Sequence, residues 1–241
     1  MTATSLASPA APAASISDHA GAADADLRRG FGPRVRRLHA RIGKAHHQAE
    51  GMAFSRALLA GEATPLQLAA LLRAVAPAYA LLEREAPALA SALGATAVPW
   101  SELARSGALE HDLSQLAALP GSPTSPTAAL WLERLRLLAR QEPHRLMAHV
   151  YVRYGGDLSG GQQLGREANA ILERCGLPPL RFWAFDQPIP ELKAALHEGF
   201  EQLDLSEEEE AELLEEAETA FVLTQRLLAE LAELEAAPLP A

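Results

Sequence analysis

Four glycines interrupt a stretch that otherwise has helical character, and they fall within seven residues: Gly155, Gly156, Gly160 and Gly161. Each glycine inside a helix costs roughly 0.5–1 kcal/mol relative to alanine, so four cost on the order of 2–4 kcal/mol. That is a large share of the net stability of a domain. The backbone here must therefore either kink or let a bulky flat partner lie directly against it.

The same run contains LSGGQ, Leu158–Gln162, the signature loop of ATP-binding-cassette ATPases. Such an ATPase also needs a phosphate-binding loop, G-x-x-x-x-G-K-[ST], between a strand and a helix. Gly43-Lys44 is followed by Ala45, and Leu38 stands where the first glycine should be. Without that loop the five letters do not indicate nucleotide binding.

Composition favours helices over sheets. Apolar residues make up 49% of the chain, mostly Ala and Leu, whereas aromatics are only 5%. Two capping boxes mark helix starts, Thr64 with Gln67 and Ser206 with Glu209. We find no convincing strand and no internal repeat, so the sequence predicts a single all-α domain.

Apolar periodicity predicts seven helical segments. The second is expected to bend or break around Pro77. The segments run from Val35 to Gly61, from Pro65 through Tyr79 and Glu83, from about 100 to 119, 127 to 140, 143 to 175, 191 to 203, and from 206 onward.

The domain boundaries follow from composition. Residues 1–27 are rich in Ala, Ser, Pro and Asp and are expected to form a flexible leader, 28–236 the helical domain and 237–241 a short tail. Nothing in the sequence requires more than a monomer.

Charge and cysteine content limit the expected binding partners and the cellular compartment. The net charge of −10 argues against nucleic-acid binding. Cys175 is the single cysteine and is expected to be a small buried hydrophobe in a reducing compartment. No charged signal region precedes Arg28, and no apolar run approaches the roughly 20 residues of a membrane span. The sequence predicts a cytoplasmic protein.

Helical spacing places polar groups beside the glycines. One face would carry Arg153, Gly156, Asp157, Gly160 and Gly161. A smooth backbone patch with a carboxylate inside it suits a large planar ligand and an ordered polar network. The alternative is a close helix crossing with an ordinary ion pair between Arg153 and Asp157.

His46 is a candidate metal ligand, since it lies four residues before Glu50 on one helix face. A carboxylate there can accept the imidazole N–H, fix the tautomer and leave the other nitrogen for iron. His47 points about 100° away on an ideal helix and is expected to lack that partner. The alternative is a pair of surface histidines.

Two motifs carry a resemblance to heme oxygenases. MAHVYVRYGGDLSGGQ, Met147–Gln162, resembles their distal-helix signature, A-H-x-Y-x-R-Y-x-G-D-L-S-G-G-Q. HHQAE, beginning at His46, is similar to the proximal segment H-x-Q-A-E. AYALLERE, ALEHDL and AETAFVLTQRLLAEL also fit the family pattern in order, from about Val35 to Leu234.

The resemblance implies an all-α fold that holds heme between a proximal and a distal helix. It also implies oxidative cleavage of heme to biliverdin, carbon monoxide and ferrous iron, using O2 and supplied electrons. Heme would be both prosthetic group and substrate. A non-catalytic heme carrier or sensor on the same fold, and a helical interaction protein without heme, remain alternatives.

Carried over by position, the resemblance assigns roles to individual residues. His46 would be the iron ligand, oriented by Glu50. Asp157 would anchor the water network that delivers protons, supported by Arg153 and Tyr79. The remaining heme contacts would be Gly156, Gly160 and Gly161 on the distal face, Phe221 near the heme edge, and Tyr151, Lys193 and His197.

The propionate positions depart from the family, which commonly uses Lys and Arg there. This sequence has His39, Gly43, Lys193 and His197, of which only Lys193 keeps a permanent charge. Heme orientation and the cleavage position therefore stay open. The alternative is that Lys193 and His197 only form a solvated helix face.

A basic stretch from Arg28 to Lys44 can attract propionates or an acidic electron donor such as a ferredoxin or flavodoxin. A solvated helix flank is the alternative. No dinucleotide-binding fingerprint is present, so the electrons are expected from a separate donor or reductase.

Overall fold

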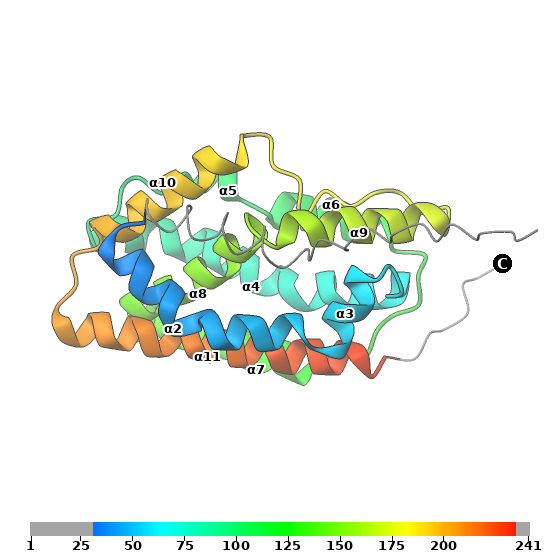
Figure 1. Cartoon of the computed structure of the whole chain (residues 1–241), viewed down its shortest axis with the longest axis horizontal. Helices are drawn as coiled ribbons and strands as arrows, with labels where there is room; N and C mark the ends of the chain where they lie inside the picture. The colour runs from blue at the N-terminus through cyan, green and yellow to red at the C-terminus, as the bar shows by residue number, and fades with distance from the viewer. Residues whose placement is uncertain (1–30, 235–241) are drawn as a thin grey trace, which may run out of the picture. The chain divides into compact units, whose positions relative to one another are not determined.

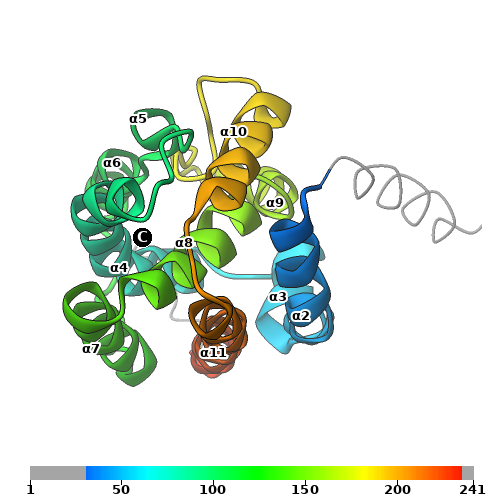
Figure 2. The same cartoon turned by 90° about the vertical axis from the view of Figure 1, so that its left-hand side faces the viewer.

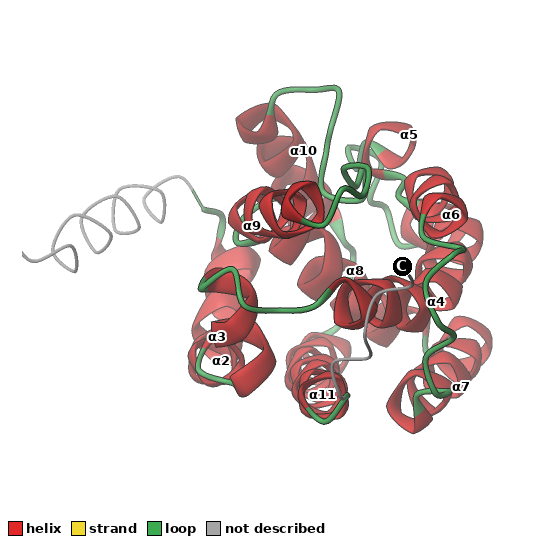
Figure 3. Cartoon of the chain, turned by 90° about the vertical axis from the view of Figure 1, so that its right-hand side faces the viewer, coloured by secondary structure: helices red, strands yellow, loops and turns green. Residues whose placement is uncertain are grey.

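The computed structural model describes residues 31–234, and every regular element in that range is an α-helix (Figure 3). The predicted all-α class is confirmed for this range. The predicted leader and tail lie outside it, so the domain boundaries stay predictions. The helices are α2 (Pro33–Glu50), α3 (Ala53–Leu59), α4 (Pro65–Ala92), α5 (Trp100–Leu103), α6 (Ser106–Gln115), α7 (Pro126–Gln141), α8 (Pro143–Asp157), α9 (Gly161–Arg174), α10 (Ile189–Gln202) and α11 (Glu207–Ala232).

Both predicted capping boxes are present. Thr64 Oγ1 accepts a hydrogen bond from Gln67 N at 3.2 Å, and Gln67 Oε1 accepts from Thr64 N at 2.9 Å. Ser206 and Glu209 form the same reciprocal pair at the start of α11. These bonds satisfy backbone donors that a helix start leaves without partners.

Three predicted helical segments are each divided in two. The break between α2 and α3 follows Gly51, after which Met52 takes an extended backbone. The second break separates α5 from α6, where Glu83 Oε1 of α4 accepts from Arg105 N at 2.5 Å and Ser106 N at 3.0 Å. The third separates α8 from α9. A cap supplied by another helix leaves no local pattern, so periodicity could not reveal the second break.

The predicted break at Pro77 is wrong, because α4 continues through that residue. The packing around it explains this, because the helix is buried along more than one face. Tertiary contacts can stabilise a helix against the missing hydrogen bond of an internal proline.

The helices pack around α4 and α8. Viewed along the long axis, α8 lies near the centre, with α11 below it, α2 and α3 on the right, α4, α6 and α7 on the left, and α9 and α10 above (Figure 2). α2 and α11 run side by side (Figure 1). The largest fully buried side chains include Tyr79 of α4 and Tyr154 of α8.

α4 is long and apolar enough to cross a membrane by length and composition alone, although Arg73 interrupts its apolar run. However, 56% of its most apolar window is buried among the other helices. Burial of that kind is typical of the core helix of a globular domain.

Cys175 does not occupy the core. It caps the C-terminal end of α9 and is partly exposed, so the expectation of a buried small hydrophobe is wrong. A helix end lies where the chain turns back toward solvent, and that position decides its exposure.

Candidate functional site

A largely apolar cavity lies between the helix of His46 and the helices that carry the glycines. α2 and α3 form one wall, the junction of α8 and α9 forms the opposite wall, and α11 contributes the side chains of Thr224, Leu227 and Leu228. Phe54 of α3 and Trp183 line the cavity as well. The two motifs singled out in the sequence therefore face one space.

On the α2 side, His46 and Glu50 both line the cavity. His46 Nδ1 lies 3.6 Å from Glu50 Oε1, longer than a hydrogen bond, and the two side chains are 49% and 57% exposed. The His46 ring packs edge-on against Phe221 of α11, with ring centroids 5.9 Å apart. Phe221 therefore supports the imidazole but is not itself part of the cavity lining, so its predicted contact with the heme edge stays a prediction.

The expectation that His47 lacks a carboxylate partner is wrong. Its Nδ1 lies 3.7 Å from Glu50 Oε2, because residues three apart on a helix are also neighbours. The two histidines differ in their surroundings instead. His47 is 90% exposed and is absent from the cavity lining, whereas His46 borders the cavity.

The four positions do not require glycine for one common reason. A methyl group built at Gly156 or Gly160 meets no atom within 4 Å, and both residues line the cavity. A methyl group at Gly161 would lie 2.8 Å from Trp183 Cδ1. Gly161 also borders the cavity, but its missing side chain makes room for an indole. A methyl group at Gly155 would meet no atom within 4 Å either, and Gly155 does not line the cavity.

The expected single helix face around Asp157 is a helix junction. α8 ends at Asp157 and α9 begins at Gly161. Gln162 Nε2 donates to the Asp157 carbonyl and to the Trp183 carbonyl, at 3.0 Å each. This amide fixes the turn, so the backbone rather than a row of side chains borders the cavity here.

A buried polar chain joins α4 to the end of α8. Tyr79 Oη donates to Asp157 Oδ2 at 2.5 Å, and Arg153 Nε donates to the same hydroxyl at 3.2 Å. Asp157 is only 3% exposed and Tyr79 is fully buried. The three residues predicted to act together are therefore brought together by the fold.

Burial sets the protonation of this chain. Burial raises the pKa of the Asp157 carboxyl, and Arg153, the Tyr79 hydroxyl and Arg105 offset only part of that effect. Burial likewise raises the pKa of Tyr79 well above its ordinary value. Tyr79 is thus a permanent hydrogen-bond donor, while Asp157 holds a proton more readily than an exposed aspartate does.

Asp112 supports the site, a role that the sequence did not reveal, although this residue belongs to the ALEHDL segment that fits the family pattern. Its carboxylate is fully buried and accepts from Arg181 N and Phe182 N at 2.8–2.9 Å. Phe182 then packs edge-on against Tyr79, with centroids 5.3 Å apart. A local sequence pattern cannot show which distant backbone groups a carboxylate will bind.

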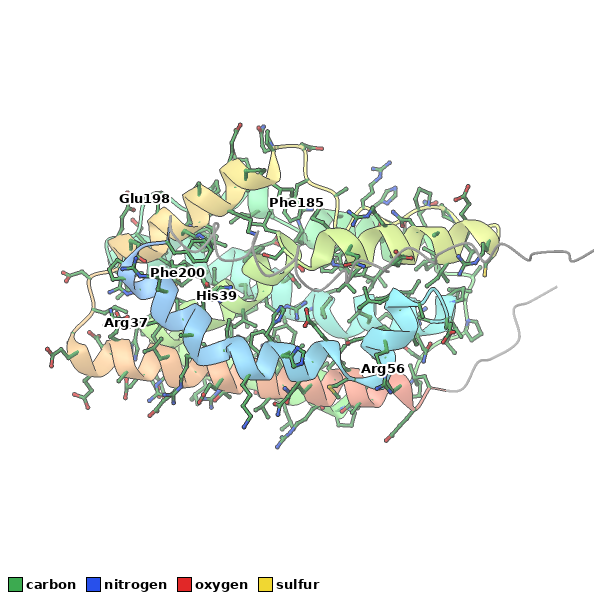
Figure 4. The ribbon with its side chains drawn as sticks, in the orientation of Figure 1. Arg37, His39, Arg56, Phe185, Glu198 and Phe200 are labelled. Atoms are coloured by element: carbon green, nitrogen blue, oxygen red, sulfur yellow. The ribbon has the colours of Figure 1, made fainter. Side chains whose placement is uncertain are left out.

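Tyr151, Lys193 and His197 do not line the cavity described above. They lie where α8 and α10 meet, and the Tyr151 and His197 rings are 6.3 Å apart. Burial, with Lys193 and His39 of α2 nearby, lowers the pKa of His197 to about 4. His39 on α2 and Phe200 on α10 mark the two helices that flank this cluster (Figure 4).

The basic stretch of α2 is partly neutralised. Arg34 and Arg37 both contact Glu210, at 2.6 and 2.9 Å, and Arg41 lies 2.9 Å from Glu218. Arg37 lies where α2 passes the start of α11 (Figure 4). The α2 surface is therefore less basic than the sequence suggests.

Comparison with known proteins gives one consistent result. The chain matches the heme oxygenase family over residues 35–230. Heme oxygenase 1 of Pongo abelii is 32% identical over 201 residues, which cover 79% of this chain and 69% of that protein.

Solved heme oxygenase structures share the fold. Heme oxygenase from Leptospira interrogans has a TM-score of 0.74 and 28% identity, and the likeness covers 83% of this chain and all of that one. Heme oxygenase-2 from Synechocystis sp. PCC 6803, solved in complex with heme and NO, has a TM-score of 0.72 and 26% identity, covering 83% and 85%. Since the matched residues include both the helix of His46 and the helix of Asp157, the chain belongs to the heme oxygenase family.

Proposed function

We propose that this protein opens heme to biliverdin, carbon monoxide and ferrous iron, using O2 and electrons from a separate donor. The observation that carries the proposal is the cavity itself. One wall presents a single histidine, and the other presents bare backbone beside a buried Tyr–Asp–Arg chain.

The residues of the cavity suit heme better than a bare ion. The described residues contain no group of three or more His, Cys, Asp or Glu side chains that could hold a metal ion. A porphyrin supplies four nitrogens to its iron, so one imidazole is a sufficient protein ligand. Open space at Gly156 and Gly160 leaves room for a flat ring, which a side chain would obstruct.

His46 is the proposed iron ligand. Its Nδ1 faces Glu50, which leaves Nε2 for the metal. A small rotation would bring the 3.6 Å contact within hydrogen-bond length, and a carboxylate that accepts the N–H makes the imidazole a stronger ligand. The Phe221 ring limits how far the imidazole can turn.

When bound, heme supplies the iron at which O2 is activated, and the protein's part is to manage protons and space. Tyr79 occupies Oδ2 of Asp157, so Oδ1 is the oxygen through which the carboxyl can hold a water in the cavity. Because burial raises the pKa of Asp157, this carboxyl takes up a proton more readily than an exposed aspartate does, which suits a group that passes protons on. Arg153 holds the Tyr79 hydroxyl in place.

The cluster of Tyr151, Lys193, His197 and His39 is the proposed site for the heme propionates. Lys193 supplies the permanent positive charge, and the histidines can add charge when a carboxylate approaches. A propionate beside His197 would favour its protonated form, against the burial that now lowers its pKa to about 4.

The electrons are proposed to come from another protein in the cytoplasm, such as a ferredoxin, a flavodoxin or a reductase. Residues 31–234 contain no strand, whereas a dinucleotide-binding unit is built on parallel strands. The half-exposed His46 and Glu50 lie on α2, which also carries Lys44. We propose this side of α2 as the approach for the donor.

The test is the absorption spectrum of the protein loaded with hemin, in air, with a reductant and catalase present. Loss of the Soret band with growth of a biliverdin band supports ring opening without free peroxide. A stable Soret band, with two unrelated reductants, would instead identify a heme carrier. If no Soret complex forms, both the assignment of His46 and the heme-binding function are wrong.

A further inference from the structure

A second buried polar chain ends at Trp131, whose ring lies beside Arg153. His149 of α8 is fully buried, and its Nε2 lies 2.8 Å from Glu216 Oε1 of α11. Trp131 Nε1 of α7 donates to His149 Nδ1 at 3.1 Å. Three helices therefore meet at one imidazole, and neither the cavity lining nor the proposed chemistry uses it.

The partners of His149 dictate its tautomer. An indole N–H can only donate, so Nδ1 must accept and carries no proton. The ring proton of a neutral imidazole is then on Nε2, where it donates to the Glu216 carboxylate. A protonated imidazole would carry a second N–H pointing at the indole N–H, so the hydrogen bond from Trp131 requires neutral His149.

The charges around His149 agree with that state. Burial lowers the pKa of His149, Glu216 raises it, and Arg134 and Arg153 lower it again. Glu216 is itself held ionised by Arg134, whose Nε donates to it at 2.6 Å, and Arg145 lies 3.8 Å away. The carboxylate is balanced by arginines, so it has no need of a second positive charge on His149.

The indole fixed in this way is one of two aromatic rings beside Arg153. The Arg153 guanidinium lies 5.5 Å from the Trp131 ring centroid and 5.5 Å from the Tyr79 ring centroid. Cation–π attraction acts at this distance. Arg153 therefore contacts both a ring held by His149 and the hydroxyl that donates to Asp157.

We propose that Trp131 and His149 are positioning residues of the distal site: Glu216 orients His149, His149 fixes the plane of Trp131, and Trp131 holds Arg153 against Tyr79. Only the effect of these residues on heme chemistry rests on the proposed function. The hydrogen-bonded chain itself exists in the heme-free protein and can be measured there.

The first experiment is a long-range ¹H–¹⁵N correlation spectrum of the heme-free protein between pH 5 and 8. His149 is expected to stay neutral with its proton on Nε2 throughout. The Trp131 indole N–H, assigned with Trp131→Phe, is expected to exchange slowly with solvent and to shift in His149→Leu. A proton on Nδ1, or titration of His149 near pH 6.5, would overturn the proposal whatever the protein does with heme.

The second experiment titrates the ferric heme complex with base and follows its absorption spectrum. The quantity measured is the pH at which half of the complex has changed from its acid to its alkaline spectrum, called the midpoint below. A nearby cation favours loss of a proton, so displacing Arg153 should raise the midpoint. Trp131→Leu and His149→Leu should each raise it by about 0.3–0.7 pH unit, a two- to fivefold change for a lost cation–π contact. His149→Gln can accept from Trp131 and donate to Glu216, so it should restore the original midpoint.

Leu138→Ala is the matched control. Leu138 is buried on α7, seven residues from Trp131, and belongs to neither polar chain. It should destabilise the fold without moving the midpoint. If Leu138→Ala moves it as much as Trp131→Leu, or if His149→Gln behaves like His149→Leu, the effect is general loosening and the positioning role is wrong. Failure of the wild-type protein to bind heme would leave the spectra of the heme-free protein as the deciding result.

Discussion

The two walls of the cavity are built in different ways. On the α2 wall, His46 and Glu50 are about half exposed and 3.6 Å apart. On the α8 wall, Asp157 is 3% exposed and accepts from fully buried Tyr79 at 2.5 Å. One pair lies four residues apart on a single helix, while the other joins residues 78 positions apart.

The difference teaches which side the protein prepares in advance. Water competes for half-exposed groups, so the His46–Glu50 contact is weak until a ligand orders it. The buried chain of Tyr79, Asp157 and Arg153 on the α8 wall, the distal wall, is shielded from water. Each hydrogen bond is stronger there, and each missing partner lowers the stability of the fold more. The fold thus fixes the wall proposed to handle protons and leaves the ligand wall adjustable.

The largest expected effect is on the distal wall. Asp157→Ala should lower biliverdin formation by about 10²–10⁴-fold, the usual contribution of a positioned proton-transfer group. Heme affinity, measured by Soret titration, should change little, since Asp157 is not the proposed ligand. Normal turnover in this variant would remove Asp157 from the mechanism.

On the opposite wall, His46→Ala should weaken heme binding by at least about tenfold, because an axial ligand is lost. The neighbouring His47→Ala is the control, since His47 is 90% exposed and lies off the cavity. Added free imidazole should restore the Soret complex of His46→Ala. Greater loss in His47→Ala would transfer the ligand role to that residue.

Two glycine substitutions separate packing from ligand space. Gly161→Ala should lower the free energy of unfolding by about 1–3 kcal/mol, since its methyl would lie 2.8 Å from Trp183. Gly156→Ala meets open space and should leave stability unchanged or slightly raised, while weakening heme binding. Denaturant unfolding and Soret titration of both variants decide this. Equal stability of the two would contradict the packing role of Gly161.

The raised pKa of Asp157 predicts that the free energy of unfolding depends on pH. The folded pKa is raised, so the folded state holds a proton that the unfolded state has already lost as pH rises above about 3.8. Stability therefore falls as pH rises through that window, and ionised Asp157 destabilises the fold at pH 7. Asp157→Asn should melt at a higher temperature than wild type at pH 7. The gain should disappear near pH 3.8, and a gain independent of pH would exclude this cause.

The smallest effect is expected at Glu50. Glu50→Gln keeps the shape and can still accept the His46 N–H through its amide oxygen, so it should weaken heme binding at most about fivefold at this half-exposed contact. If binding falls as far as in His46→Ala, the contact must tighten strongly around the ligand, and the contrast between the two walls would exist only before heme binds. Soret titrations of the two variants, measured together, give the answer.

Local patterns predicted much of the fold. The Thr64 and Ser206 capping boxes, and the helices that became α7, α10 and α11, all depend on residues three or four apart. The same spacing placed His46 beside Glu50. Periodicity failed where another helix supplies the cap, as Glu83 does for α6, and where packing supports a helix through Pro77.

The sequence alone determined the helical class, the paired His46 and Glu50, and, through its resemblance to a known family, the choice of Asp157 as the proposed proton-handling residue. Only the tertiary structure decided why Gly161 differs from Gly156, that His47 shares Glu50, and that Asp112 and Trp131 support Tyr79 and Arg153. The reason is physical: helical spacing fixes neighbours within one turn or two. Burial and contacts between helices, which set pKa values and decide which groups meet, depend on segments far apart in the chain.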